Sequence, residues 1–238
     1  KTVGFCYITN HDIPLENIEE AFAAMAEFFS LPIKEKEKLL PFEGFRGYYQ
    51  LCQEVTLGLK DWHEGVDMIA PLSEAEGCWE SLPSQEERAK HPLLCSTNEL
   101  LDKEKMCGNQ SAERLQKAIR THWESCQKLG MKLMQMFVRG LEGTGATISA
   151  DFFAEEPFCI TRLLHYPPYG PNDHSEDVGI GVGEHTDYGC LTLLLQDEVG
   201  GLQVKNRNGE WYDVRPIPGA FVINLGDALA AWSGGILK

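Results

Sequence analysis

An imidazole and a carboxylate lie two residues apart in the segment Gly183-Glu184-His185-Thr186-Asp187. If this segment is extended, both side chains point to the same face, because side chains alternate along a strand. A histidine beside an aspartate supplies two members of the 2-His-1-carboxylate triad, which holds non-haem iron(II) and leaves positions open for substrate and O₂. Because such a pair is common by chance, its surroundings must support the chemistry.

Short strands are predicted throughout the last third of the chain, separated by Gly, Pro, Asn and Asp. The apolar or β-rich runs are Ile160 to Tyr166, Cys190 to Leu195, Leu202 to Val204, Trp211 to Val214 and Ala220 to Leu225. Asn208-Gly209, between two of these runs, predicts a hairpin with a type I′ turn, which needs positive φ at both central residues. His185 and Asp187 thus lie in a β-rich region.

Helices are predicted ahead of these strands. Apolar residues recur at helical spacing from Leu15 to Phe29 and again from Asn109 to Leu141, and a shorter helix is predicted from Lys34 to Leu40. Residues 43–70 are expected to be an irregular mix of short strands and turns, because they show no clear period. Helices followed by short strands favour an α+β fold whose sheet closes on itself as a sandwich or jelly roll.

The charge and cysteine content of the chain indicate which classes of partner to expect. The 36 acidic and 21 basic residues give a formal net charge of −15, which repels phosphate backbones and anionic lipid surfaces. We therefore expect no nucleic acid and no membrane as partner, and no apolar run reaches membrane-spanning length. The eight cysteines include no CxxC pair, which favours reduced thiols and a cytoplasmic location. We expect a monomer.

Motifs along the chain resemble those of one enzyme family. His185-Thr186-Asp187-Tyr188-Gly189, followed by Leu191-Thr192-Leu193, resembles the iron-binding strand of the isopenicillin N synthase-like 2-oxoglutarate oxygenases. The other matching motifs are Gly4-Phe5 through Asn10-His11, Arg46-Gly47-Tyr48, Asp61-Trp62-His63-Glu64-Gly65, Leu163 to Pro168, Gly200 to Val204, and Asn224-Leu225-Gly226-Asp227. Because they follow the family's order over nearly the whole chain, the resemblance is specific.

The resemblance implies a double-stranded β-helix, or jelly-roll, core backed by N-terminal and central helices. It implies a single oxygenase domain over residues 1–238, with a mainly helical part over 1–150 and an incomplete jelly-roll part over 151–238. It also implies iron(II) as cofactor and 2-oxoglutarate as co-substrate. The reaction would use O₂ to oxidise a small organic molecule by hydroxylation, desaturation or ring closure.

The resemblance also implies roles for single residues. His185 and Asp187 are expected to bind iron, and Tyr166 to contact the distal carboxylate of 2-oxoglutarate. By strand alternation Arg162 shares a face with Tyr166, so we expect it either to bind a substrate carboxylate or to pair with a structural acidic residue. Tyr188 is expected to contact substrate or to pack.

The C-terminal stretch suggests an incomplete site. In the family, the stretch resembling Trp232 to Lys238 leads into a strand with the second histidine ligand and then an arginine and a serine for the co-substrate. We therefore expect a chain truncated at both ends, with the third ligand, a histidine, after Lys238 and the C-terminal core strand missing. His165 should point away from the site, and His174 lies in a polar loop, so neither is expected to replace it.

Three interpretations stay open for the activity. The chain is expected to be an incomplete version of a 2-oxoglutarate-dependent dioxygenase. The alternatives are an iron oxidase of the same fold that does not use 2-oxoglutarate and a catalytically inactive binding protein. Asn224 and Asp227 suit a strand end and a turn, so no chemistry is assigned to them.

The 238-residue polypeptide tested alone is expected to give little or no turnover, because two protein ligands bind iron less firmly than three. Consumption of 2-oxoglutarate in the presence of Fe(II) and O₂ is the measurement. Robust consumption by this polypeptide would contradict the expectation.

Overall fold

The computed structural model describes residues 4–39, 47–69, 106, 108–146, 148, 159–170 and 177–237. The chain divides into two compact units. Unit 1 comprises residues 1–18, 124–154 and 186–238, and unit 2 comprises residues 19–123 and 155–185. The division falls inside two helices, α1 (Leu15–Phe29) and α5 (Gln110–Arg139), and each unit is described by itself.

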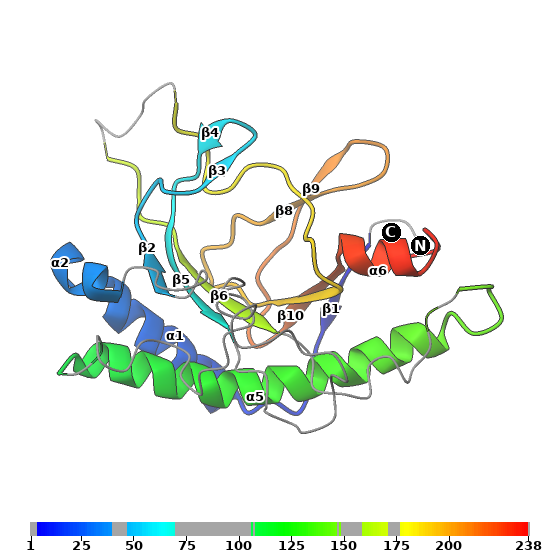
Figure 1. Ribbon diagram of the computed structural model, residues 1–238, viewed down its shortest axis with the longest axis horizontal. Coiled ribbons are helices and arrows are strands. Elements are labelled where there is room, and N and C mark those ends of the chain that lie inside the picture. The colour runs from blue at the N-terminus through cyan, green and yellow to red at the C-terminus, as the bar shows by residue number, and fades with distance from the viewer. Residues whose placement is uncertain are drawn as a thin grey trace, which may run out of the picture. The chain divides into compact units, whose positions relative to one another are not determined.

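Unit 2 contains a three-stranded antiparallel sheet, shown in Figure 1. Its strands are β2 (Gly47–Tyr49), β5 (Glu64–Ile69) and β6 (Ile160–His165), in that order. The same unit holds helix α2 (Ile33–Lys36), the 3-10 helix η1 (Glu37–Leu39) and a hairpin of β3 (Val55–Thr56) and β4 (Leu59–Lys60).

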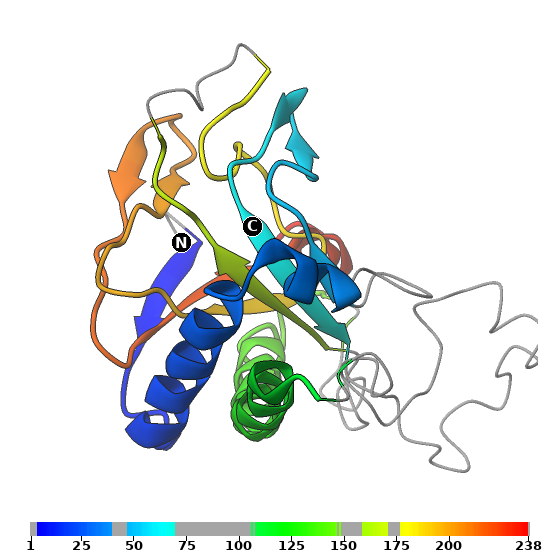
Figure 2. The same cartoon turned by 90° about the vertical axis from the view of Figure 1, so that its left-hand side faces the viewer.

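The core of unit 2 lies between this sheet and the α1 and α5 segments of the unit (Figure 2). Its buried side chains include Ala21, Ala24 and Phe28 of α1, Ala112, Leu115 and Ile119 of α5, and Tyr48, Val66, Met68 and Leu163 of the strands. The helical spacing places these apolar residues on one face of each helix, as predicted. Because Leu163 enters this core, alternation along β6 places Arg162 and Leu164 on the other face.

Unit 1 contains a second antiparallel sheet, ordered β1 (Phe5–Ile8), β10 (Phe221–Leu225) and β7 (Leu191–Leu194). In its register Asn224 of β10 lies opposite Thr192 of β7. Helix α6 (Asp227–Trp232) follows β10 directly, and β8 (Gln203–Lys205) pairs with β9 (Trp211–Asp213) as a hairpin. Val204, Val214 and Val222 form a buried cluster in this unit.

The predicted helices and the five predicted strand runs of the last third are present, and the architecture is α+β as expected. The predicted type I′ turn is wrong. Gly209 has a φ of 84°, but Asn208 does not have a positive φ. The Asn206 carboxamide oxygen instead accepts from the backbone N–H groups of Asn208 and Glu210, so only the glycine needs the left-handed conformation.

The mix of short strands and turns expected over residues 43–70 is present in the residues that the structure describes, 47–69, where four strands form. β2 is buried at all three positions, and Glu64 and Asp67 of β5 are buried as well. A strand buried on both faces shows no alternation of apolar and polar residues. Arg46 and Leu40, two residues of the predicted patterns, lie outside the described residues.

The described residues were also searched for membrane-spanning helices and disulfides. Within the described ranges, no helix has both the length and the apolar character needed to cross a membrane. The described cysteines, which are Cys6, Cys52, Cys126, Cys159 and Cys190, form no disulfide with one another. The single domain over residues 1–238 stays a prediction.

Glu64 is a buried carboxylate that joins several elements of unit 2. Lys36 Nζ donates to its two oxygens at 2.9 and 2.7 Å, and Tyr48 donates to one of them. His165 Nδ1 lies 2.8 Å from Glu64 Oε1. Burial alone would raise the pKa of Glu64, but the bonds from Lys36, Tyr48 and His165 together hold that pKa below its ordinary value. The network therefore links α2, β2, β5 and β6.

Lys36→Met is expected to lower the free energy of unfolding by about 3–5 kcal/mol, because it leaves the buried Glu64 carboxylate without its cation. Lys38→Met is the matched control, since Lys38 forms an exposed pair with Glu35 that contributes about 1 kcal/mol or less. Urea unfolding near pH 7 measures both. Equal losses in the two variants would contradict the prediction.

The same network predicts a pH dependence. The pKa of Glu64 is lower in the folded protein than in the unfolded chain, so its contribution to stability is present above the unfolded pKa of about 4.3 and is lost as pH falls through the folded pKa. Urea unfolding of the wild type below about pH 4 should show this loss.

Candidate functional site

The segment with the predicted iron ligands has no regular secondary structure. Residues 183–190 form bends and irregular backbone, and β7 begins only at Leu191. Strand alternation therefore does not set the directions of His185 and Asp187, contrary to the extended segment considered from sequence. His185 belongs to unit 2 and Asp187 to unit 1, so each side chain is described within its own unit.

His185 is oriented by the backbone two residues before it. Its Nδ1 lies 2.9 Å from the carbonyl oxygen of Gly183. Because a carbonyl can only accept, Nδ1 carries the hydrogen, and in the neutral ring the lone pair is then on Nε2. Metal-binding histidines characteristically donate their other ring N–H to a carbonyl or carboxylate in this way. The tautomer suits coordination through Nε2.

Asp187 is held through one carboxylate oxygen. Asn224 Nδ2 donates to Oδ2 at 2.7 Å, and the Thr192 hydroxyl donates to the same oxygen. Thr192 and Asn224 are direct partners across β7 and β10, so their side chains lie on one face of the sheet. Sequence reasoning assigned no chemistry to Asn224, and this contact corrects that interpretation: Asn224 orients the predicted iron ligand.

The main chain around Asp187 is fixed by the residues that follow β10. The Asp227 N–H donates to the Asp187 carbonyl at 2.7 Å. A Cβ at Gly226 would lie 2.2 Å from the Gly189 carbonyl oxygen and 2.8 Å from that of Asp187, so only glycine permits this approach. The Asn224-Leu225-Gly226-Asp227 motif, which sequence analysis noted only as a match, therefore supports the ligand loop.

Arg162 is occupied by acidic side chains. Its Nε and Nη2 donate to the two oxygens of Asp67 at 3.0 and 2.8 Å, and Nη1 and Nη2 donate to Glu54 at 3.1 and 3.0 Å. Of the two predicted alternatives, the contacts are those of pairing with structural acidic residues. Burial raises the pKa of Asp67, and Arg162 opposes that rise. The Arg162 side chain is still 45% exposed.

Tyr166 directly follows β6 in unit 2. Among the described residues its hydroxyl has no hydrogen-bond partner. Desolvation by surrounding atoms, with the charge of Asp61, raises the pKa of Tyr166 to about 12, so the phenol is neutral and able to donate at pH 7. The residue is 48% exposed. Tyr188, in unit 1, is 76% exposed.

The other histidines considered as a replacement ligand are placed as follows. His165 bonds to Glu64 and stacks on Phe29, away from the face of Arg162, as expected. His174 lies outside the described residues. Within the part of the chain that the structure describes, no group of three or more His, Cys, Asp or Glu side chains is arranged to hold a metal ion.

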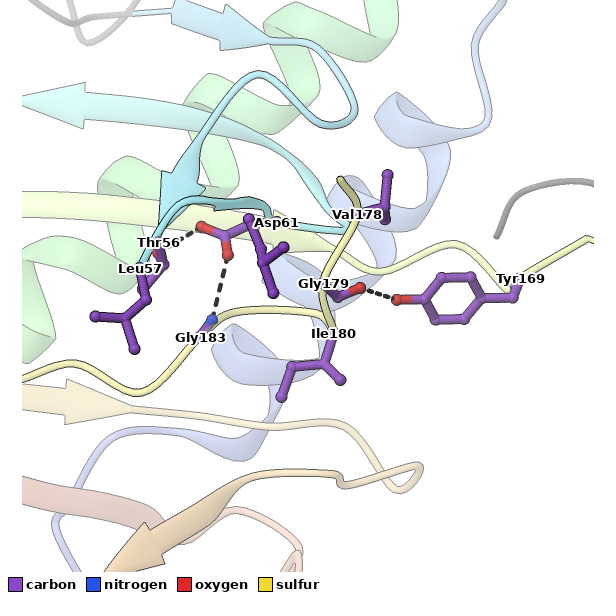
Figure 3. A pocket seen from close by; sticks show the side chains of 9 residues that line it. Thr56, Leu57, Asp61, Tyr169, Val178, Gly179, Ile180 and Gly183 are labelled. Atoms are coloured by element: carbon purple, nitrogen blue, oxygen red, sulfur yellow. Dashed lines mark hydrogen bonds between the residues drawn. The ribbon is translucent and has the colours of Figure 1, made fainter. Parts of the chain in front are cut away.

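A cavity of about 510 Å³ borders the ligand segment within unit 2 (Figure 3). Its walls are mostly apolar and come from the β3–β4 hairpin and from residues 178–183. The lining includes Leu57, Leu59, Tyr169, Ile180, Asp61 and Gly183. Gly183 is the residue whose carbonyl accepts from His185, so the cavity adjoins the segment that orients the predicted ligand.

Comparison with known proteins identifies the family. Residues 157–238 match the 2OG-Fe(II) oxygenase superfamily, and residues 1–91 match the N-terminal region of the non-haem dioxygenase in morphine synthesis. A homoarginine-6-hydroxylase from Glycine max is 32% identical over 99% of this chain and 67% of its own length. The chain belongs to the 2OG-Fe(II) oxygenase superfamily.

Further relatives agree with this oxygenase assignment. A Dictyostelium discoideum protein named as a probable iron/ascorbate oxidoreductase is 33% identical over the whole of this chain and 66% of its own. A full-length Neurospora crassa protein, crystallised with alpha-KG and thymine, superposes with a TM-score of 0.72 at 27% identity, covering 99% of this chain and 68% of its own. The oxygenase chain thus spans about two thirds of the length of these relatives.

The comparisons confirm the resemblance inferred from sequence and the jelly-roll class of the fold. They also confirm Fe(II) and 2-oxoglutarate as the cofactor and co-substrate of the family. The roles of His185, Asp187, Tyr166, Arg162 and Tyr188 stay predictions.

Asn224→Ala in the complete oxygenase is expected to weaken Fe(II) binding by about 10- to 100-fold, the usual effect of removing a partner that orients a metal ligand. Anaerobic Fe(II) titration measures the affinity. Asn208→Ala is the control, because Asn208 is an exposed turn residue of the same unit. An unchanged affinity in Asn224→Ala would refute the orienting role.

Proposed function

We propose that the complete protein is an Fe(II)- and 2-oxoglutarate-dependent dioxygenase that uses O₂ to oxidise a small organic molecule by hydroxylation, desaturation or ring closure. The main support is the orientation of two side chains. His185 donates Nδ1–H to the Gly183 carbonyl, and Asp187 is held through Oδ2 by Thr192 and Asn224. Each side chain is thus held by contacts within its own unit, as expected of a residue that serves as a metal ligand.

The donor set fits iron(II), which accepts imidazole nitrogen and carboxylate oxygen together. In this proposal His185 Nε2 and a carboxylate oxygen of Asp187 hold the metal, and a histidine beyond Lys238 completes the triad. Iron bound there would supply the oxidising chemistry together with 2-oxoglutarate and O₂, with decarboxylation of the co-substrate to succinate. The protein's own part is to fix the ligands and to bind and orient the two organic molecules.

Tyr166 is proposed to bind 2-oxoglutarate. Its neutral hydroxyl can donate to the distal carboxylate, and a hydrogen bond to a charged group is stronger than one between neutral groups. Arg162 and Tyr188 are proposed to contact the substrate. The support for Arg162 is the exposed part of its guanidinium, and for Tyr188 it is high exposure beside Asp187 in sequence.

The alternatives receive less support. Solved relatives that contain alpha-KG favour a 2-oxoglutarate-dependent enzyme over an oxidase that does not use it. A catalytically inactive binding protein would not need donors that orient both His185 and Asp187. We also propose a cytoplasmic monomer without nucleic acid partners, on the basis of the acidic net charge of −15 and the scattered cysteines.

Anaerobic addition of Fe(II) and 2-oxoglutarate to the complete protein is expected to produce the visible charge-transfer band of chelated co-substrate. His185→Ala and Asp187→Ala should abolish the band, because each removes a ligand. Tyr166→Phe should keep iron binding and raise the KM for 2-oxoglutarate by about 10-fold or more.

Tyr212→Phe is the control for the tyrosine variant, since Tyr212 lies on an exposed hairpin and bonds to Glu210. A wild-type protein that binds Fe(II) and 2-oxoglutarate without any band, or a fully active Asp187→Ala variant, would overturn the proposed function.

A further inference from the structure

The segment that approaches His185 is held along another part of unit 2. The Lys60 N–H donates to the Asp177 carbonyl at 2.9 Å, and the Gly179 N–H donates to the Lys60 carbonyl at 2.9 Å. The Trp62 N–H then donates to the Ile180 carbonyl at 3.1 Å. Lys60 and Val178 form a parallel bridge. Residues 177–180 therefore run beside residues 60–62 in a short ladder.

Glycines at alternate positions let this segment lie close to its neighbours. They are Gly179, Gly181 and Gly183. A Cβ at Gly181 would lie 2.9 Å from the Tyr166 ring, and one at Gly183 would lie 2.7 Å from Thr56 Cγ2. Glycine has more backbone conformational freedom than other residues. Other contacts are therefore needed to fix the direction of the Gly183 carbonyl.

Asp61 supplies such a contact at the end of the ladder (Figure 3). It is 4% exposed, and its Oδ1 accepts from the Gly183 N–H at 3.2 Å. Its Oδ2 accepts from the Thr56 hydroxyl at 2.7 Å. The Gly183 carbonyl in turn accepts from His185 Nδ1. A single residue thus separates the buried carboxylate from the carbonyl that sets the histidine tautomer.

We propose that Asp61 is a positioning residue for His185. By holding the Gly183 N–H, the carboxylate limits the φ and ψ of a residue that otherwise has wide freedom, and this fixes the carbonyl that receives Nδ1–H. The Asp61-Trp62-His63 motif, noted from sequence only as a family match, then acts as the support of the ligand segment. This inference rests on the proposed function insofar as His185 binds iron.

Three variants of the complete protein test the proposal. Asp61→Ala removes the acceptor and is expected to weaken Fe(II) binding by about 10-fold or more. Asp61→Asn keeps an acceptor oxygen for the Gly183 N–H and is expected to restore most of the affinity. Lys60→Met is the matched control, because it removes only the exposed ion pair to Asp177 on the same segment. Anaerobic Fe(II) titration and thermal unfolding are measured for each.

The tautomer of His185 provides a readout that needs no iron. Nitrogen NMR of the metal-free wild type is expected to show the hydrogen on Nδ1, and Asp61→Ala is expected to show a mixture of tautomers. A loss of affinity caused only by lower stability would leave the tautomer unchanged. If the wild type binds no iron but its tautomer depends on Asp61, the positioning role stands and the proposed function fails.

Two results would overturn the proposal. One is an Asp61→Ala variant with wild-type Fe(II) affinity and the wild-type tautomer. The other is measured on the wild type: either the Gly183 amide exchanges freely with solvent, or the His185 ring carries its hydrogen on Nε2. This measurement tests the proposal even if Asp61→Ala does not fold. A protected Gly183 amide together with the Nδ1–H tautomer supports the proposal.

Discussion

The backbone from Gly183 to Cys190 forms neither helix nor strand. The structure of the ligand segment therefore depends on hydrogen bonds to residues outside it. Irregular backbone must find partners for its N–H and C=O groups, and side chains on it start with more freedom to lose than those in a strand. Hydrogen bonds from residues outside the segment meet both needs. In unit 2 they come from Asp61 through Gly183, and in unit 1 from Thr192, Asn224 and Asp227.

Buried carboxylates serve this architecture repeatedly. Asp61, Glu64 and Asp67 all lie within seven residues of unit 2, and all are buried. Each has its own donors: Asp61 has a hydroxyl and a backbone amide, Glu64 has Lys36 among its partners, and Asp67 has Arg162. A buried charge without such donors would be strongly destabilising. Some of the acidic residues therefore stabilise the interior of unit 2 and add little to the charge at its surface.

The separation of contacting residues along the chain explains what the sequence could and could not predict. The spacing of apolar residues predicts α1 and α5 because each helix faces a core through one stripe, and the family motif predicts the pair His185 and Asp187 as ligands. The orientation of that pair depends on contacts across 122 residues for Asp61 and Gly183 and across 37 for Asn224 and Asp187. No local pattern contains such pairings. The bounds of β5 were not predicted for a related reason, since its buried polar residues are compensated by partners elsewhere in the chain.

Charge compensation also distinguishes Arg162 from Tyr166, the two side chains predicted to share one face. Arg162 contacts two carboxylates, so most of its capacity to attract an anion is already used inside the protein. A substrate carboxylate would have to compete with Asp67 in a bidentate geometry that suits the guanidinium well. Tyr166 differs, because its hydroxyl is neutral and has no hydrogen-bond partner among the described residues. To bind an anionic group, Arg162 would have to exchange its carboxylate partners, whereas Tyr166 would not have to give up a hydrogen bond to any described residue.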